Sequence, residues 1–178
     1  DYDEKDFVEV FGDVISYNGN LQLNIKQLRV AGEGEYNPVD YMPTSDKSVD
    51  GMYEELMRYG AQVKNPYLQQ IIQYYFVKDE AFIKRFKGHS AAKTVHHGFA
   101  GGLLEHTLSV VKMCEYMAGA YSILSKDLLY TAAMCHDIGK TRELSPFPDN
   151  DYTDDGQLLG HIVIGVEMID DAIREIPN

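Results

Sequence analysis

Near the start of the chain, apolar and polar side chains alternate with a period of two, which is typical of a β-strand with one buried face. The alternation spans residues 7–30 and breaks once, at Tyr17-Asn18-Gly19-Asn20. An Asn-Gly pair between two such runs favours a two-residue turn, because both residues tolerate a positive φ. The pattern therefore predicts a β-hairpin. Since two strands are marginally stable alone, we expect the hairpin to dock on a surface or to belong to a larger sheet.

From about residue 50 onward the apolar spacing changes to three and four residues, which is the period of an α-helix. The intervening residues 37–50 contain two prolines and predict a linker with local turns. Cap residues precede the first three helical stretches, namely Ser48 or Asp50, Asn65 followed by Pro66, and Asp79. Further helices are predicted at about 102–121, 126–138 and 157–176, and residues 144–155, with two prolines and four aspartates, predict a mobile loop. The fold class is therefore mainly α.

Composition narrows the class of protein without identifying it. A chain of 178 residues can bury one good core, or one core and a small appendage. Its longest apolar runs fall well short of the roughly 20 residues that a membrane span needs, so we expect no membrane partner. The acidic N-terminus does not resemble a signal peptide, and Cys114 and Cys135 lie in apolar stretches typical of reduced core thiols. These features favour a cytoplasmic protein.

The charge distribution bears on nucleic acid as a partner. A net charge of −12 argues mildly against it. However, residues 81–97 contain no acid, and four cations lie there: Lys84, Arg85, Lys87 and Lys93. This stretch is either a basic surface for phosphate or an ordinary solvated helix face.

Candidate metal ligands are concentrated in the second half of the chain, where all six histidines lie between His89 and His161. His136-Asp137 ends an apolar helical run, and burying a carboxylate without a partner is costly. A divalent metal would supply that partner, because imidazole and carboxylate together suit first-row metals. His106 and His161 each lie near the start of another apolar helix. Any one histidine could be an ordinary hydrogen-bonded core residue, but together they predict a metal site.

Gly139 and Lys140, which follow closely after His136-Asp137, have predicted roles as well. Gly139 is expected to cap the helix that ends at His136-Asp137, as glycine commonly does at helix C-termini. Such a cap would let Lys140 turn towards the same site. Lys140 is therefore predicted to stabilise charge there, and a solvated cation at the helix end is the alternative.

The order His106, His136-Asp137, His161 resembles the HD superfamily of metal-dependent phosphohydrolases. A closer resemblance, to the YhaM-type 3′-to-5′ exoribonucleases, rests on the stretch 91–106, which contains His96-His97, Gly101-Gly102-Leu103 and His106. It extends to His136-Asp137-Ile138-Gly139-Lys140 followed by Glu143-Leu144, and to the stretch from Tyr152-Thr153 through His161. The resemblance implies a helical HD-domain bundle at residues 51–178, preceded by a short β-hairpin remnant of an OB-fold at residues 1–36. It also implies that Tyr17, Lys26 and Arg29 of the hairpin contact a single strand, and a purely structural hairpin is the alternative.

The resemblance also implies a site and a reaction. His106, His136 and Asp137 would hold one divalent metal, for which the family expectation is Mn²⁺, and Asp137 would bridge to a second metal that His161 helps to bind. Water would then attack phosphorus and expel the ribose 3′-oxygen, releasing a nucleoside 5′-monophosphate from single-stranded RNA or DNA. Asp137 and Lys140 are the expected catalytic residues. Lys93, His96, His97 and Lys140 are the expected substrate contacts, and a structural role is an alternative for each histidine.

Two expectations qualify this reading. The family has further ligands after the His161 helix that this chain lacks, so we expect a piece of a longer protein, with a C-terminally truncated HD domain, weak metal binding and little activity. Two other functions stay open: an HD phosphohydrolase of small nucleotides, and a nucleic-acid-binding protein without catalysis. Association into a homo-oligomer is open as well.

Overall fold

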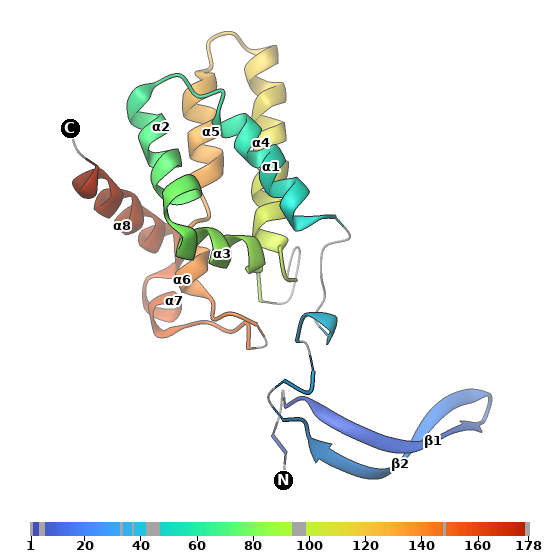
Figure 1. Ribbon diagram of the computed structural model, residues 1–178. Coiled ribbons are helices and arrows are strands. Elements are labelled where there is room, and N and C mark those ends of the chain that lie inside the picture. The colour runs from blue at the N-terminus through green and yellow to red at the C-terminus, as the bar shows by residue number, and fades with distance from the viewer. Residues whose placement is uncertain are drawn as a thin grey trace. The chain divides into compact units, whose positions relative to one another are not determined.

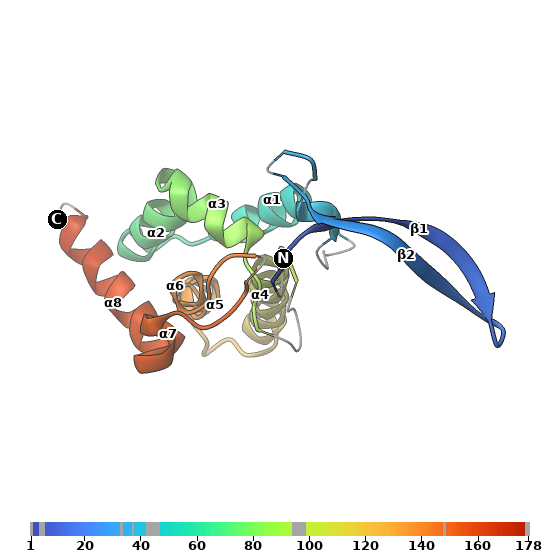
Figure 2. The same ribbon diagram turned by 90° about the horizontal axis from the view of Figure 1, so that it is seen from below.

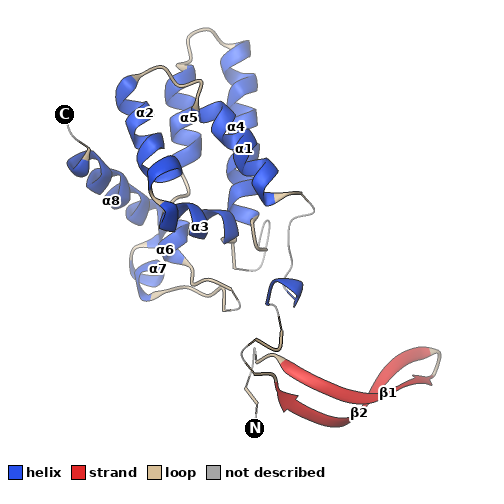
Figure 3. Ribbon diagram, in the orientation of Figure 1, coloured by secondary structure: helices blue, strands red, loops and turns tan. Residues whose placement is uncertain are grey.

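In the computed structural model the chain forms two units, Asp1–Tyr41 and Met42–Asn178 (Figure 1). Both strands lie in the first unit, and helices α1–α8 lie in the second (Figure 3). The mainly α fold class, with a two-stranded hairpin before the helices, is thereby confirmed. The structure describes residues 2–3, 6–32, 34–36, 38–41, 47–93, 99–147 and 149–176.

The first unit contains the predicted antiparallel hairpin of β1 (Val8–Tyr17) and β2 (Asn20–Val30). Its turn residues Asn18 and Gly19 have φ values of 50° and 82°, as a tight Asn-Gly turn requires. The register shifts by one residue between Phe11 and Gly12, which is a β-bulge. Among the described residues these two strands form the whole sheet, so the OB-fold stays a prediction.

The hairpin has one apolar face and one mainly polar face, on which Phe11, Ile15 and Tyr17 also lie. Residues that pair across the strands, such as Val8 with Val30 and Val14 with Leu23, point to the same side. None of the side chains in either strand is buried. The apolar face is formed by Val8, Val10, Val14, Leu21, Leu23, Ile25, Leu28 and Val30.

Cations on the polar face are already paired with acids of the same unit. Lys26 contacts Asp13 at 2.5 Å, and Arg29 contacts both Glu9 and Glu35. The guanidinium of Arg29 and the backbone N–H of Gly32 donate hydrogen bonds to Glu35, and they lower the pKa of its carboxyl to about 2. The positive charge of this face is therefore largely neutralised.

The predicted linker at 37–50 falls partly outside the described residues, which omit 37 and 42–46. Its described part contains the 3₁₀-helix η1 (Pro38–Tyr41), and the helix α1 (Val49–Gly60) begins within its last residues.

The first helices of the second unit begin at the predicted caps. Ser48 caps α1, and Asn65 precedes Pro66 at the start of α2 (Pro66–Gln73). Asp79 caps α3 (Glu80–Gly88), accepting a hydrogen bond from the N–H of Phe82 at 2.8 Å. One difference from the prediction is that α2 does not continue as an α-helix to residue 76. It changes to the π-helix η2 (Tyr74–Lys78), which carries Tyr75 and Phe76 into the core.

The core lies between these helices and the pair α4 (Gly102–Ala120) and α5 (Lys126–Cys135), which run side by side (Figures 1 and 2). Four rings stack or meet edge to face at its centre, and such pairs add to the stabilisation from burial. Their centroids lie 4.9–5.6 Å apart. The four residues are Tyr75, Phe76, Phe82 and Phe86.

The C-terminal part differs from the prediction of one loop and one helix. A bridge joins Leu144 to Tyr152, and the helix α7 (Asp154–Leu158) begins before the expected loop ends. A separate helix, α8 (Gly160–Glu175), follows, because Gly160 has a φ of 73° that interrupts the helix. No helix of the described chain combines the length and apolarity needed to cross a membrane.

Candidate metal centre

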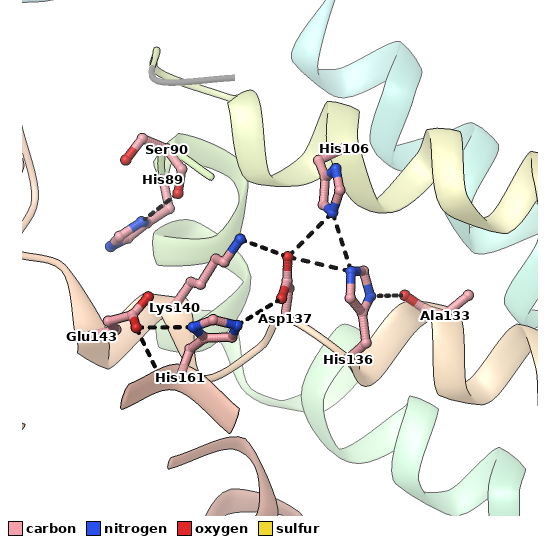
Figure 4. Close-up of polar contacts among 9 residues, drawn as sticks. All are labelled: His89, Ser90, His106, Ala133, His136, Asp137, Lys140, Glu143 and His161. Atoms are coloured by element: carbon pink, nitrogen blue, oxygen red, sulfur yellow. Dashed lines mark hydrogen bonds and ion pairs between the residues drawn. The ribbon is translucent and has the colours of Figure 1, made fainter. Parts of the chain in front are cut away.

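The candidate site is built around Asp137, which lies just after the end of α5 (Figure 4). Its neighbour Ile138 is fully buried and fixes this turn to the core. Asp137 itself is 5% exposed, so its carboxylate needs partners within the protein. The structure places four such partners around it: His106, His136, Lys140 and His161.

His106 and His136 lie on one side of Asp137. The Nε2 atoms of His106 and His136 are 3.2 Å and 3.3 Å from Oδ2 of Asp137, and 3.2 Å from one another. On its other ring nitrogen, His136 lies 2.8 Å from the carbonyl oxygen of Ala133. A carbonyl can only accept, so Nδ1 of His136 carries a proton, and in the neutral ring Nε2 has a free lone pair. The three side chains therefore converge with ligand atoms of the types that divalent metals prefer.

Lys140 supplies a positive charge next to the carboxylate of Asp137. It begins the one-turn helix α6 (Lys140–Glu143), and its Nζ lies 2.8 Å from Oδ2 of Asp137. Burial acts to raise the pKa of Asp137, but the hydrogen bonds and charges of His136 and Lys140 outweigh it and hold that pKa well below its usual range. For His136 burial acts in the opposite direction and lowers the pKa. The carboxylate of Asp137 more than compensates, so that the net shift of the His136 pKa is upward.

His161 approaches the other carboxylate oxygen of Asp137. Its Nε2 lies 3.6 Å from Oδ1, whereas His106, His136 and Lys140 all face Oδ2. The structure thus brings together His106, His136, Asp137, Lys140 and His161, from three separate segments of the sequence (Figure 4).

The prediction for Gly139 was wrong. Its φ is −61°, an ordinary helical value, so it is not a left-handed cap. Glycine is needed there because α8 passes very close: a Cβ on Gly139 would lie 2.1 Å from the carbonyl oxygen of His161. This backbone contact places His161 beside Asp137, and nothing in the local sequence around Gly139 indicates it.

The predicted substrate contacts are described only in part. His96 and His97 lie outside the described residues. Lys93 is described, and its Nζ contacts Asp151 at 2.6 Å. In the same basic stretch, Lys87 contacts Asp50 at 2.5 Å. Two of the four cations between 81 and 97 are therefore paired with acids.

Glu143 is the residue near the site to which sequence reasoning assigned no role. Its carboxylate is buried and contacts His161, 18 positions further along the chain (Figure 4). The spacing carries no helical or strand signal, because an intervening loop and α7 bring the two residues together.

Residues 103–176 match the family model of the HD domain, and this range contains His106, His136, Asp137, Lys140 and His161. This part of the chain is thus similar to HD domains, and an HD domain in general indicates metal-dependent phosphohydrolysis. No solved structure matches the chain. The donor set also fits the metal such a domain binds, since two imidazole nitrogens and one carboxylate oxygen lie within 4.8 Å of one another.

Proposed function

We propose that this protein is a metal-dependent phosphodiesterase that shortens single-stranded RNA, or single-stranded DNA, from the 3′ end. The observation that carries the hydrolase part is the convergence of His106 and His136 on Asp137, inside the matched HD domain. The polymer part is supported by the resemblance of residues 91–106 to exoribonucleases and by the hairpin that precedes the helices.

The site residues have distinct proposed roles. His106, His136 and Asp137 would hold one divalent metal, with Mn²⁺ as our choice, and Asp137 with His161 would contribute to a second. Bound metal would supply Lewis acidity and a water of lowered pKa. The ammonium of Lys140, which lies 2.8 Å from Asp137, would pair with a phosphate oxygen and stabilise the charge that develops on it. Lys93, His96 and His97 remain proposed substrate contacts.

A small nucleotide is the second candidate substrate, and one observation favours it. Six cations could follow an RNA backbone, and four of them pair with acids of the protein: Lys26, Arg29, Lys87 and Lys93. The other two are Lys84 and Arg85. A polymer substrate gains affinity from several phosphate contacts, whereas a mononucleotide needs few beyond the site itself. A binding protein without catalysis is the third candidate. It is less well supported, because it gives no reason for a buried Asp137 surrounded by two histidines and a lysine.

The test is a cleavage assay with a 5′-labelled single-stranded RNA and Mn²⁺, in which Asp137→Ala is the control. We expect weak metal binding, so Mn²⁺ is supplied in large excess over the protein. The expected result is a ladder that shortens slowly from the 3′ end and disappears with Asp137→Ala. A parallel assay offers mononucleotides and cyclic nucleotides under the same conditions.

Each outcome separates the candidates. Hydrolysis of small nucleotides without shortening of RNA would replace the exonuclease by the second candidate. Binding of RNA without any hydrolysis, unchanged in Asp137→Ala, would favour the third. Internal cleavage of the RNA would contradict the proposed 3′-to-5′ direction.

A further inference from the structure

The carboxylate of Glu143 lies behind His161, on the side away from Asp137 (Figure 4). Glu143 is 8% exposed, and one of its oxygens, Oε1, accepts two hydrogen bonds from the same residue. The backbone N–H of His161 and its ring atom Nδ1 both lie 2.9 Å from that oxygen. A single carboxylate oxygen therefore holds both the main chain and the imidazole of His161.

The main chain of Glu143 is itself held firmly. Its carbonyl oxygen accepts a hydrogen bond from the N–H of Thr153 at 3.0 Å. Gly156 of α7 packs against the same carbonyl so closely that a Cβ there would lie 2.1 Å from the oxygen. Gly160 has a φ of 73°, and this turn directs the start of α8 back towards the carboxylate. The position of Glu143 is thus set by the backbones of α6, α7 and α8.

The contact has a consequence for the chemistry of His161. A carboxylate has no hydrogen to donate, so Nδ1 of His161 must be the donor. In the neutral ring, Nε2 then has a free lone pair, and this atom lies 3.6 Å from Oδ1 of Asp137. The carbonyl of Ala133 selects the same tautomer in His136. Both histidines therefore present Nε2 to Asp137, one to each of its oxygens.

We propose that Glu143 is a positioning residue that fixes the tautomer and the orientation of His161, so that Nε2 is ready to bind metal beside Asp137. The part concerning metal rests on the proposed function, whereas the part concerning the tautomer does not. A carboxylate behind a ligating histidine also increases the basicity of the ligand, and loss of such a partner reduces metal affinity by about 10- to 100-fold.

The competing explanation is that Glu143 merely caps α8. The N–H of His161 lies in the first turn of α8, where backbone donors have no partner within the helix. A carboxylate that accepts from such a donor stabilises the helix. Asp127 provides a matched control, because its Oδ2 accepts hydrogen bonds from the backbone N–H groups of Lys64 and Asn65, at 3.0 Å and 2.7 Å. Asp127 contacts none of the site residues described above.

The first measurement is a long-range proton–nitrogen NMR spectrum of the metal-free protein, labelled in its histidines. It is recorded at pH 8, above the usual imidazole pKa of about 6.5. The signals of His161 are identified by their loss in His161→Gln. We expect the proton on Nδ1 in the unmodified protein, a shift towards the Nε2-protonated form in Glu143→Ala, and no change in Asp127→Ala. Glu143→Gln retains an acceptor, so it should keep the Nδ1 proton.

The second measurement is Mn²⁺ affinity by calorimetric titration of the same variants. Glu143→Ala should bind at least tenfold more weakly than the unmodified protein, and Asp127→Ala should bind equally well. Glu143→Gln should lie between them, because it keeps the acceptor and loses the charge.

The two measurements distinguish the inference from the function it builds on. A proton on Nε2 of His161 in the unmodified protein would overturn the inference directly, and so would an unchanged tautomer in a folded Glu143→Ala. If Glu143→Ala does not fold, the unmodified protein and Glu143→Gln decide, and loss of the Nδ1 proton in Glu143→Gln would contradict the proposal. Absence of Mn²⁺ binding in the unmodified protein, with the tautomer as expected, would refute the metal function and leave the positioning role in place.

Discussion

The hairpin and the helical unit use apolar residues in opposite ways. The hairpin places eight aliphatic side chains on one face, and no side chain of its strands is buried. The helical unit buries an aromatic cluster, and it fixes Asp137 to that core through Ile138. An amphipathic strand pair acquires a core only when something covers its apolar face, whereas helices of the same chain cover one another. A regular local pattern is therefore sufficient for an element but not for a core.

The largest expected difference between the units is the effect of removing an apolar side chain. Phe82 is fully buried, so Phe82→Ala should lower the free energy of unfolding by about 3–5 kcal/mol. Leu23 is 51% exposed, and Leu23→Ala should change that free energy by about 0.5 kcal/mol or less. Urea unfolding monitored by circular dichroism measures both. A comparable loss in Leu23→Ala would show that the apolar face of the hairpin is covered in solution.

Glycines in the two units provide the next test. Gly139→Ala would force a Cβ against the backbone of His161, and we expect it to destabilise the helical unit by about 1–3 kcal/mol and to weaken Mn²⁺ binding. Gly19→Ala meets no neighbouring atom, and only its φ of 82° opposes it, so its cost of about 1–2 kcal/mol should be confined to the hairpin.

Gly119, in α4, is the control for the glycine test, because nothing lies within 4 Å of its Cβ position. Gly119→Ala should stabilise the helical unit by up to about 1 kcal/mol. Unchanged metal binding in a folded Gly139→Ala would mean that the close approach of α8 does not determine the geometry of the site.

A pH titration should affect the helical unit and spare the hairpin, which contains no histidine. Burial lowers the pKa of His89. The carbonyl oxygens of Ser90 and Leu144 face its two ring nitrogens and can both accept a hydrogen bond only from the protonated ring, and they offset the lowering only in part. The unfolded chain therefore binds the proton more readily. The stability contributed by neutral His89 should be complete above the unfolded pKa, about 6.5, and should decline as the pH falls below it.

The measurement is the urea midpoint of the helical unit between pH 8 and pH 5, for the unmodified protein and for His89→Gln. The unmodified protein should lose more stability on acidification than the variant does. Since the raised pKa of His136 contributes a slope of the opposite sign in both proteins, the difference between them isolates His89. Parallel curves would contradict the prediction.

The smallest effect concerns the paired charges of the hairpin. Glu9 and Asp13 contact Arg29 and Lys26 on the exposed polar face. Replacing them together, as Glu9→Gln with Asp13→Asn, should leave the unfolding midpoint unchanged, because exposed ion pairs contribute little. If this face contacts nucleic acid, the loss of two negative charges beside Lys26 and Arg29 should tighten binding of single-stranded RNA at low salt, as measured by fluorescence anisotropy.

The control for this charge test is Asp170→Asn, which removes an exposed ion pair with Arg174 in the helical unit. It should leave RNA binding unchanged. An equal increase in both variants would indicate a general effect of net charge and no specific role of the hairpin.

Local sequence signals predicted most of the secondary structure. Asn18-Gly19 determined the turn, and Ser48, Asn65 and Asp79 marked three helix starts, because the physics of turns and caps acts within a few residues. The prediction was less accurate where distant contacts decide. The start of α8 depends on Gly160 turning the chain towards Glu143, and periodicity alone suggested one continuous helix there.

In the candidate site, too, local sequence signals were sufficient for some features, and distant contacts decided the others. The residue types of His106, His136, Asp137 and His161 suggested a metal site without any knowledge of the fold. How they converge could not be predicted, because it depends on α8 approaching Gly139 and on Glu143 holding the ring of His161. Both contacts join segments that lie about twenty positions apart, and neither produces a periodic pattern.

The close approach at Gly139 also fixes the distance between the parts of the chain that form the site. Where side chains separate two helices, their spacing can adjust as rotamers change, and each substitution shifts it slightly. At Gly139 main chain meets main chain, so the spacing has a lower limit given by atomic radii alone. The separation of His161 from Asp137 is therefore specified by the backbone. Substitutions in the surrounding core can therefore change the stability of the protein and leave the distance between His161 and Asp137 unchanged.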